Sequence, residues 1–486
     1  MSSPSGPWRA ALDDVDRRLG DRVDRFVCAH HVRRLRRLGW SAALSAGPGE
    51  GREERPAREG NSVEVLVDGE EALGAMVEAI VGARSYVHIA GWFASPDFRP
   101  IREPGAPTLA EILTEVAERV PVRILLWAGP PVPVFKPTRG MVRASRDDFM
   151  GDSKVRCELD RRERTMHCHH EKLVVVDDEV AFVGGIDFTD LSGDRLDSSA
   201  HAPDRALGWH DLATRLRGPI VADVAGHFAQ RWSEVAAEPL PEPVVPAPVG
   251  TTSVQLVRTV PERTYEFAEK GEFTILQSYL RALRSARSLI YLENQFLWSG
   301  EVVDVLVDRL LRPPQDDFRL LVLLPTRPND GADTTRGQLG RLIAADAGHD
   351  RLLAVTINSH ADDRTGPLYV HAKVGIVDDS WLTIGSANLN EHSLFNDTEV
   401  NVVIRDPDEV RATRLRLWSE HLQLPETEIS GDPAKVIDGL WRPMAAAQAQ
   451  LTQSGSPRTH RLTLLPNLSR RAERLQGPLR GLLVDG

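Results

Sequence analysis

The chain has 486 residues, of which 41% are hydrophobic, 27% charged and 6% aromatic. This composition is typical of a folded globular protein and excludes a disordered or fibrous one. The 59 basic and 70 acidic residues leave a net charge of -11, so the molecule as a whole repels nucleic acids and anionic membranes, and a site for a polyanion would have to be a local basic cleft.

The first element expected along the chain is helical. Apolar side chains recur at steps of three and four residues, at Trp8, Leu12, Val15, Leu19, Val23 and Phe26. This spacing predicts an amphipathic helix or a helical pair over residues 8–40, packed on the main body. Residues 47–61 have no apolar period and predict an exposed connection, so we expect the folded body to begin near Ser62.

The body begins with a strand, a helix and a strand within residues 62–92, because two β-branched runs flank apolar residues at helical spacing. Further strands are predicted at residues 122–129, 173–178 and 181–185. Short apolar runs that alternate with helices indicate an α/β sandwich whose sheet is buried on both faces. Residues 136–148 and 326–341 follow corresponding strands and predict loops near the mouth of a site.

The chain contains an internal repeat on either side of a stretch with five prolines, residues 238–250. The segment 170–187 matches 371–388 at a constant offset of 201 residues. Two copies are too few for a solenoid, so we expect two α/β lobes related by a pseudo-two-fold axis, with the active site at their interface. The predicted units are a helical extension (1–61), a first lobe (62–237), a Pro-rich linker (238–250), a second lobe (251–440) and a C-terminal tail (441–486).

The cysteines and the N-terminus indicate the compartment. Cys28, Cys157 and Cys168 form an odd, sparse set without metal-type spacing, which argues against a disulfide framework and a structural zinc site. The N-terminus has no apolar signal region, and no run of about 18 apolar residues occurs. We therefore expect a cytoplasmic protein without a signal peptide or transmembrane segment.

Each lobe carries one copy of a His-x-Lys-x4-Asp pattern. The residues are His170, Lys172 and Asp177 in the first lobe, and His371, Lys373 and Asp378 in the second. Strand alternation places His and Lys on one face. Only six of the 59 basic residues are lysines, which marks two positions where a compact ammonium is used in place of a guanidinium. A lone histidine is more commonly a core or surface side chain, but two patterns at matching positions favour a functional site.

Small and polar residues follow each pattern. Gly184 and Gly185 correspond to Gly385 and Ser386, and Asp187 corresponds to Asn388. Small residues allow a ligand to approach the backbone closely, and Ser and Asn can donate hydrogen bonds to an oxyanion. We therefore take Gly185, Asp187, Ser386 and Asn388 as candidate phosphate-binding residues.

At these residues the sequence resembles the phospholipase D superfamily, whose paired HxKxxxxD motifs are each followed by GG or GS and then Asn. The resemblance covers residues 62–420 approximately. The flanking runs HIAGWFASPDF, WHDLATRLRGP and IYLENQF are more similar to bacterial phospholipase D and cardiolipin synthase relatives than to the tyrosyl-DNA phosphodiesterase branch, which lacks the Asp of the motif.

The resemblance implies a two-step phosphodiester transfer through a phosphohistidine. It assigns His170 as the nucleophile and His371 as the general acid and base, although the sequence itself does not distinguish this order from the reverse. Lys172 and Lys373 would neutralise the phosphate oxygens, so no metal or other cofactor is expected. Asp177 and Asp378, grouped with the catalytic motif, are more suited to supporting the site than to acting on the substrate.

An orienting acid is expected for each imidazole. Alignment of residues 210–219 with 398–407 pairs Asp211 with Glu399, each near the start of a strand, and the family places an orienting acid at about this point. Surface carboxylates at strand starts remain the alternative.

Two features depart from a simple reading. Asp187 stands where the family has Asn, and its carboxylate would repel a phosphate unless a cation such as Arg195 pairs with it. The run HCHH at residues 167–170 resembles a zinc site, but contiguous strand residues point to opposite faces, so a shared tetrahedral site is not expected.

The function predicted is metal-independent phosphodiester hydrolysis or transfer on glycerophospholipids, giving phosphatidic acid plus an alcohol, or a transphosphatidylated lipid. The alternatives are a cardiolipin synthase-like phosphatidyltransferase, a nuclease, and a binding protein with an inactive site. The expected partner is a phospholipid at a membrane surface, for which residues 33–40 and the tail arginines Arg470, Arg471 and Arg474 are candidate contacts; salt-bridged helix faces remain the default for both. Nucleic acid is disfavoured by the net charge, and a monomer is consistent with both motifs lying in one chain.

Overall fold

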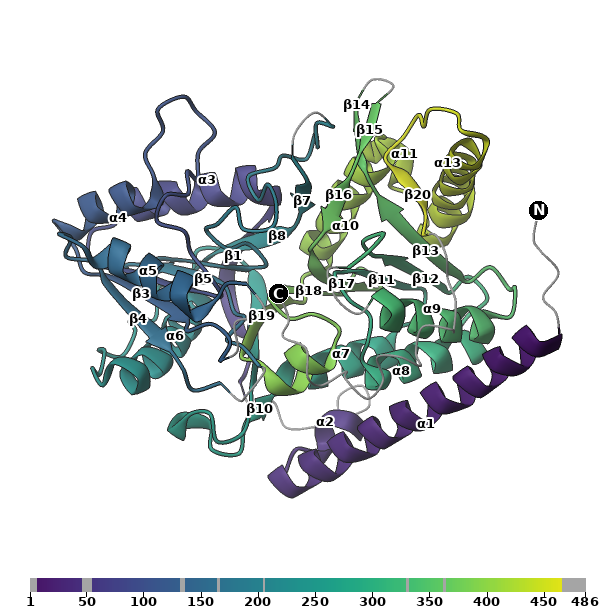
Figure 1. The fold of residues 1–486 in the computed structure, drawn as a ribbon, viewed down its shortest axis with the longest axis horizontal. Helices are drawn as coiled ribbons and strands as arrows, with labels where there is room; N and C mark the ends of the chain where they lie inside the picture. Colours follow the sequence, from purple (N-terminus) through teal and green to yellow (C-terminus); the bar gives the residue numbers. More distant parts are fainter. Residues whose placement is uncertain are drawn as a thin grey trace.

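The computed structural model describes residues 7–45, 55–131, 136–163, 167–203, 206–328, 332–361 and 364–465. Two α/β lobes lie side by side and share one mixed sheet of 16 strands (Figure 1). The predicted fold class, two tandem α/β lobes, is confirmed.

The first lobe alternates strands and helices. Its elements are β1 (Arg58–Val67), α3 (Asp68–Val81), β2 (Val87–Gly91), α4 (Leu109–Ala117), β3 (Val122–Trp127), α5 (Arg139–Met150), β4 (Arg156–Asp160), β5 (Leu173–Val176), β6 (Val180–Gly184), β7 (Gly208–His210), β8 (Leu212–Arg217) and α6 (Ile220–Ala236).

The second lobe follows an irregular segment over residues 238–250. Its elements are β9 (Thr252–Val260), β10 (Glu272–Phe273), α7 (Thr274–Ser285), β11 (Leu289–Asn294), α8 (Gly300–Leu311), β12 (Arg319–Leu323), α9 (Ala332–Asp346), β13 (Leu352–Ile357), β14 (Ser359–Ala361), β15 (Arg364–Gly366), β16 (Leu368–Val370), β17 (Lys373–Val377), β18 (Trp381–Gly385), β19 (Glu399–Ile404), α10 (Pro407–Leu422), α11 (Glu426–Ile429), α12 (Pro433–Val436), α13 (Arg442–Ser454) and β20 (Leu462–Leu464).

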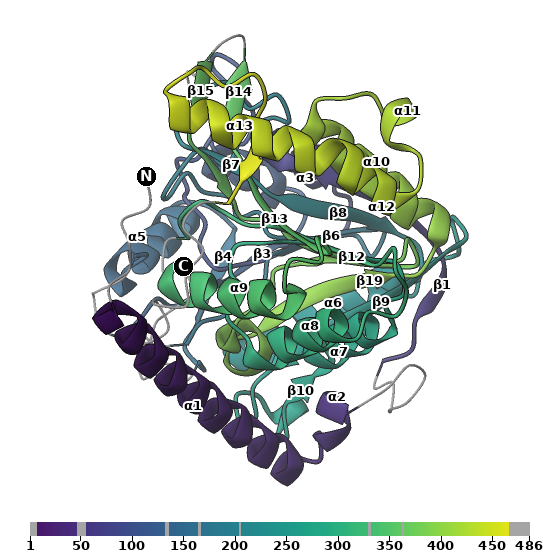
Figure 2. The same ribbon diagram turned by 90° about the vertical axis from the view of Figure 1, so that its right-hand side faces the viewer.

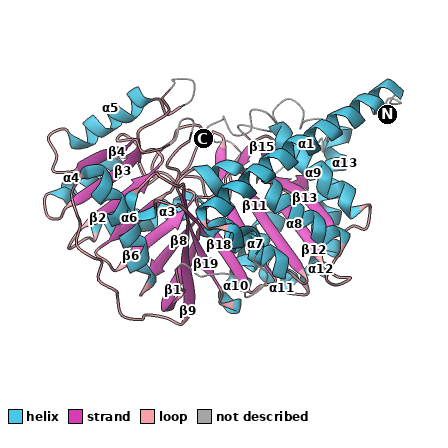
Figure 3. Ribbon diagram, turned by 90° about the horizontal axis from the view of Figure 1, so that it is seen from below, coloured by secondary structure: helices cyan, strands magenta, loops and turns pink. Residues whose placement is uncertain are grey.

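The strand order repeats from lobe to lobe. It runs β4-β3-β2-β5-β6-β8-β1 in the first lobe and β13-β12-β11-β17-β18-β19-β9 in the second, and β20 extends the second lobe at its edge. The two halves meet where β1 and β9 pair antiparallel, with Arg58 opposite Val254 and Asn61 opposite Thr252 (Figure 3). The sequence repeat is therefore a repeat of topology about the β1–β9 contact.

Helices cover both faces of this sheet (Figure 2). Strands β5, β6, β17 and β18 are buried along their whole length, as expected for a sheet enclosed between helical layers. One apolar core runs through both lobes beneath α6 and α10, and separate cores lie on the opposite face of each lobe. No helix in the described ranges is long and apolar enough to cross a membrane.

The N-terminal extension docks differently from the prediction. It forms α1 (Pro7–Leu38) and α2 (Ser41–Ser45), but Phe26, a member of the predicted apolar stripe, is 70% exposed. The face of α1 that packs on the second lobe carries Leu35, which is completely buried in the apolar core. The same face makes two ion pairs: Nδ1 of His31 lies 2.7 Å from Glu301, and Arg34 lies 2.6 Å from Glu262. The buried face of α1 is thus partly apolar and partly charged. The side chains of Trp8, Leu12, Val15 and Leu19 lie outside the described residues.

The prediction of loops at residues 136–148 and 326–341 is wrong, because both segments contain helical residues. Residues 136–148 lie mostly in α5, which begins after Thr138, whose hydroxyl accepts from the Met141 amide, and which buries Val142 and Phe149. Residues 326–341 lead into α9. Helix α5 was missed because arginines are frequent in its sequence and it has few apolar residues, such as Val142 and Phe149, to mark a buried face.

The structure describes only one of the two basic patches that we proposed as membrane contacts. Within residues 33–40, Arg34 is buried in its ion pair with Glu262, whereas Arg33, Arg36 and Arg37 are exposed. The tail arginines at residues 470–474 lie outside the described residues. Within the described part of the tail, α13 and β20 pack on the second lobe, where β20 pairs antiparallel with β13.

The aspartate of each motif holds a turn in its own lobe. Asp177 accepts hydrogen bonds of 2.7–2.8 Å from the backbone N–H groups of residues 84–86. Asp378 accepts the equivalent bonds from residues 287–289. Both turns carry the repeated Ala-Arg-Ser sequence, and both aspartates have positive φ, 60° and 51°. In each lobe, the repeated Ala-Arg-Ser segment and the repeated motif aspartate therefore contact each other.

These contacts predict a structural effect of replacing either aspartate. We expect Asp177→Ala and Asp378→Ala each to lower the free energy of unfolding by about 3 kcal/mol, because three backbone donors lose a charged acceptor. Asp177→Asn, which keeps one acceptor oxygen and tolerates positive φ, should lose less. Denaturant unfolding measures the change, with Asp190→Ala at an exposed position as control. Unchanged stability together with lost activity would instead place these aspartates in the chemistry.

Candidate active site

The two motifs place their imidazoles and ammonium groups at the boundary between the lobes. His170 and Lys172 directly precede β5, and His371 and Lys373 stand at the start of β17. All four side chains are buried, with at most 4% exposure. Buried cations and imidazoles in this number are costly unless other groups compensate them.

Two short pairings between the lobes fix the backbone of the site. The His170 amide donates to the Thr398 carbonyl at 2.9 Å, next to a parallel bridge between His169 and Thr398. On the other side β16 pairs in parallel with β7, and the His371 amide donates to the His210 carbonyl at 2.8 Å. Each motif histidine therefore lies beside the other lobe's segment that carries a predicted orienting acid.

The orienting acids are exchanged between the lobes. Nδ1 of His170 lies 3.1 Å from Oε1 of Glu399, and Nδ1 of His371 lies 2.6 Å from Oδ2 of Asp211. An Nδ1–H that donates to a carboxylate fixes the tautomer and ring orientation and leaves Nε2 as the nitrogen for chemistry. The sequence singled out both acids but not this exchange, which depends on how the lobes pack.

Glu399 is itself held by two hydroxyls. Ser386 and Ser393 donate to its carboxylate, the latter at 2.6 Å. Ser386 is one of the predicted phosphate-binding residues, but its hydroxyl contacts Glu399 and the Val400 backbone. Its contacts in this structure support the orienting acid.

Gly185, also predicted to bind phosphate, makes room for the other acid. A Cβ atom at Gly185 would lie 2.2 Å from Oδ1 of Asp211. A side chain there would displace the carboxylate that contacts His371. The prediction that this position requires close approach is consistent with the structure, but the group that approaches is Asp211.

The two lysines have parallel contacts and one difference. Each Nζ donates to the carbonyl of the histidine two residues earlier, at 2.6 Å for Lys172. Lys172 is also 3.2 Å from Oδ2 of Asp187, whereas Lys373 donates to Oε1 of Gln295 at 3.1 Å. The first lobe thus pairs its lysine with a carboxylate where the second uses an amide.

The carboxylate of Asp187 is compensated by nearby donors. Its Oδ1 accepts from the Trp92 amide at 3.0 Å, and its Oδ2 lies 3.8 Å from Arg195 in addition to Lys172. The predicted pairing with Arg195 is present. Asn388, the equivalent residue of the second lobe, donates to Oε1 of Gln295 at 3.3 Å.

Electrostatics shift two groups of the second half-site. Burial and the positive charges of Lys373, Arg195 and Lys172 hold the pKa of His371 well below its usual value. Burial raises the pKa of Asp211 to about 6, although Lys373 and Arg195 act in the opposite direction. Burial thus disfavours the charged form of both members of the His371–Asp211 pair.

Aromatic rings flank both imidazoles. The Trp92 ring lies edge-on to His170 with centroids 6.5 Å apart, and the Trp209 ring is 4.4 Å from His371. The Arg195 guanidinium lies 4.0 Å above Trp209. No role was predicted for either tryptophan or for Gln295, although all three lie in the runs that carry the family resemblance. Only the contacts in three dimensions assign them to the site.

Two other groups of predicted residues lie elsewhere. Asp177 and Asp378 follow the far ends of β5 and β17 and contact the turns described above, so the structure does not bring them to the imidazoles. The histidines of HCHH have separate partners: His167 contacts His392 and Asp397, His169 contacts Asp160, and His170 contacts Glu399. Among the described residues, no potential metal-binding group contains two of these three histidines.

The arrangement combines a nucleophile, an acid and fixed positive charge. Two imidazoles with oriented tautomers can attack phosphorus and transfer a proton, and two buried ammonium groups can stabilise negative charge on phosphate oxygens.

Both halves of the chain are similar in sequence to known protein families. Residues 79–208 match the family described as phospholipase D, and residues 279–418 match the one described as cardiolipin synthase, PLD-like domain. Phospholipase D A of Dictyostelium discoideum is 27% identical over 479 residues, which cover 78% of this chain, and phospholipase D1 of Schizosaccharomyces pombe is 27% identical over 512 residues, which cover 80%. The chain spans 37% of the length of each of these relatives.

A solved structure has the same fold. Phosphatidylserine synthase from Haemophilus influenzae superposes with a TM-score of 0.55 at 13% identity, covering 83% of this chain and 95% of its own. The predicted bacterial branch within the superfamily stays a prediction, since the curated relatives named above come from a slime mould and a yeast. With both halves matched and the paired motifs in place, the chain belongs to the phospholipase D superfamily.

Proposed function

We propose that this protein is a phospholipase D-type phosphodiesterase and phosphatidyltransferase that acts on glycerophospholipids through a phosphohistidine. The observation that carries the proposal is the exchanged pair of His–carboxylate contacts, with one lysine beside each imidazole. The names of the relatives, phospholipase D, supply the substrate class.

The first step breaks the bond between phosphorus and the head-group oxygen. Nε2 of His170 attacks phosphorus with its lone pair while the leaving oxygen takes the proton from Nε2 of His371. The head-group alcohol departs, and a phosphatidyl group remains on His170. Lys172 and Lys373 stabilise the charge that develops on the non-bridging oxygens.

The second step returns the enzyme to its starting state. His371, now neutral, takes a proton from water or an alcohol as that oxygen attacks phosphorus. The bond from phosphorus to Nε2 of His170 breaks, giving phosphatidic acid with water or a transphosphatidylated lipid with an alcohol. Hydrolysis and transfer are thus alternative fates of one intermediate, and access of water decides between them.

The electrostatics bear on which histidine attacks. The lowered pKa of His371 in the free protein favours a neutral imidazole, which suits a nucleophile or a base. A bound phosphodiester carries a negative charge that offsets Lys172 and Lys373, and this raises the pKa of His371 towards the protonated form that an acid requires. We therefore retain His170 as the nucleophile, with the reverse order as the alternative.

A cardiolipin synthase-like transfer is a second candidate. The match of residues 279–418 to a family of that name favours it, and it requires only that a lipid alcohol replaces water in the second step. One chain supplies both histidines and both acids, so a monomer suffices for either reaction. Access to the substrate would be by peripheral contact with a membrane surface in the cytoplasm.

Product analysis tests the proposed function. Wild-type protein, incubated with mixed phospholipid vesicles and a primary alcohol, is expected to release phosphatidic acid and phosphatidyl alcohol, identified by mass spectrometry. His170→Ala and His371→Ala should lose both products by at least roughly 1,000-fold, because each removes a group needed in both steps.

The matched control is His349→Ala, which removes an exposed histidine outside the site. It should form products at the wild-type rate. Equal product formation by the His170→Ala and His371→Ala variants, or no lipid product from folded wild-type protein, would contradict the proposal.

The raised pKa of Asp211 predicts an acid limb in the pH profile. Above about pH 6 Asp211 is ionised and stabilises the imidazolium of His371; below it the acid is neutral and this support is lost. We expect kcat/KM to fall as the pH drops through about 6. Asp211→Asn should lower kcat by roughly 100-fold or more and abolish this limb, since an amide does not titrate.

Glu399→Gln is the comparison for this measurement, because it weakens the contact to His170 and leaves Asp211 in place. It should reduce kcat and retain the limb near pH 6. An unchanged limb in Asp211→Asn would show that another group causes it.

A further inference from the structure

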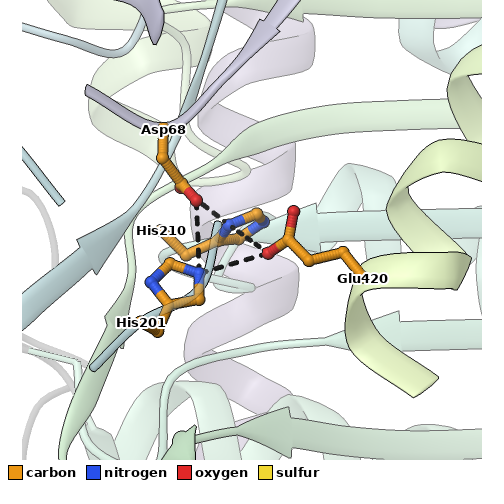
Figure 4. Close-up of side chains that lie close together, drawn as sticks. All are labelled: Asp68, His201, His210 and Glu420. Atoms are coloured by element: carbon orange, nitrogen blue, oxygen red, sulfur yellow. Dashed lines mark hydrogen bonds and ion pairs between the residues drawn. The ribbon is translucent and has the colours of Figure 1, made fainter. Parts of the chain in front are cut away.

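A second cluster of buried histidines and carboxylates lies next to Asp211 and the backbone of His371. Asp68 at the start of α3, His201 in the loop before β7, His210 in β7 and Glu420 in α10 point toward one another (Figure 4). Asp68, His201 and His210 are completely buried. None of the four contacts the reacting groups of the proposed mechanism.

The ligand atoms that the four side chains offer all lie within 4.8 Å of one another. Nε2 of His201 is 3.2 Å from Oδ2 of Asp68 and 3.1 Å from Oε1 of Glu420. Nδ1 of His210 is 2.9 Å from Oδ1 of Asp68 and 3.7 Å from Oε1 of Glu420. Zinc bonds of about 2.0–2.1 Å in a tetrahedron require ligands about 3.3 Å apart.

The second nitrogen of each imidazole is already held by a carboxylate. Nδ1 of His201 lies 2.9 Å from Asp197, and Nε2 of His210 lies 2.9 Å from Glu293. Metal-ligating histidines nearly always donate their other ring N–H to such a partner, which orients the ring and raises its basicity. The cluster thus has an inner set of four ligands and an outer set of two carboxylates.

A further observation concerns Asp68. Among the described residues, its buried Oδ2 accepts no hydrogen bond, although it lies 3.2 Å from His201. Asp68 and His201 both have positive φ, 63° and 42°, which is uncommon for residues other than glycine and is retained when a specific contact requires it.

We propose that Asp68, His201, His210 and Glu420 bind one divalent cation of the zinc type. Two imidazoles with two carboxylates suit a borderline metal, whereas calcium and magnesium prefer oxygen ligands throughout. This departs from the sequence expectation of no metal, because the four ligands come from separate elements with no motif spacing. The ion would not touch the reacting atoms, and the test of its binding does not depend on the proposed function.

The site would position the half of the active site that contains His371 and Asp211. Oδ1 of Asp68 accepts from the Asp211 amide at 3.0 Å, and the His210 carbonyl accepts from the His371 amide at 2.8 Å. Because Glu420 belongs to the second lobe, the ion would also join the two lobes beside Asp211. Its ligands act through Asp211 and His371 and do not touch the substrate.

Protons compete with the ion for these ligands. An imidazole binds a metal only in its neutral form, so metal binding releases any proton held at the ligand nitrogen, and affinity for zinc should fall as the pH is lowered.

Zinc titration of the metal-stripped wild-type protein, in competition with a chromophoric chelator, tests the proposal. We expect one equivalent to bind, the melting temperature to rise with added zinc, and cobalt(II) in its place to give the strong visible absorption of a tetrahedral site. Glu420→Gln and His201→Asn should abolish the tight equivalent. Asp197→Asn, which removes an outer partner, should weaken affinity by about 10- to 100-fold.

The control variant is His167→Asn, in a separate buried group of His167, His392 and Asp397 that shares no residue with the proposed site. It should keep the full equivalent. Three results would overturn the proposal: no stoichiometric zinc binding by the wild type, undiminished binding by both ligand variants, or loss of the equivalent in His167→Asn. If the ligand variants do not fold, the wild-type titration alone still decides, because absence of one bound equivalent leaves only a charged hydrogen-bond network.

Discussion

The active site depends on one structural constraint, the exchange of orienting acids between the lobes. Glu399 of the second lobe holds His170 of the first, and Asp211 of the first holds His371 of the second. Two short parallel pairings keep this register, one between residues 168–170 and 398–399 and one between β7 and β16. Neither lobe alone contains an imidazole together with its acid, so the pair of lobes is the smallest unit that can assemble the site.

The second requirement is compensation of buried charge. The two motif lysines, Lys172 and Lys373, are at most 4% exposed. An isolated buried cation would lose its proton or destabilise the fold. Lys172 is balanced by Asp187, and Lys373 is surrounded by the Gln295 oxygen and the His371 carbonyl. Burial is the largest cause of the strong depression of the His371 pKa, and the positive charges of Lys373, Arg195 and Lys172 act in the same direction.

Much of the architecture was predictable because it repeats. The offset of 201 residues gave the two lobes, and local spacing gave most of the strands near the motifs. What required the structure is everything that long-range packing decides: the exchange of Asp211 and Glu399, the contact of Ser386 with Glu399, and the ion pairs of α1 with the second lobe. The role of the motif aspartates was predictable only in part. The Ala-Arg-Ser segments and the aspartates were both recognisable as repeats in the sequence, but the contact between them was not.

Trapping the covalent intermediate tests the central claim most directly. His371→Ala lacks the group that activates water in the second step, so a phospholipid with a good leaving group should transfer its phosphatidyl group to the enzyme and leave it modified. Peptide mass spectrometry under alkaline conditions is expected to find the phosphatidyl group on His170 and on no other residue. Modification of His371 in the reciprocal His170→Ala variant alone would reverse the roles, and a failure of both variants to hold any phosphorus, while the wild type turns over the same substrate, would contradict a covalent mechanism at this pair.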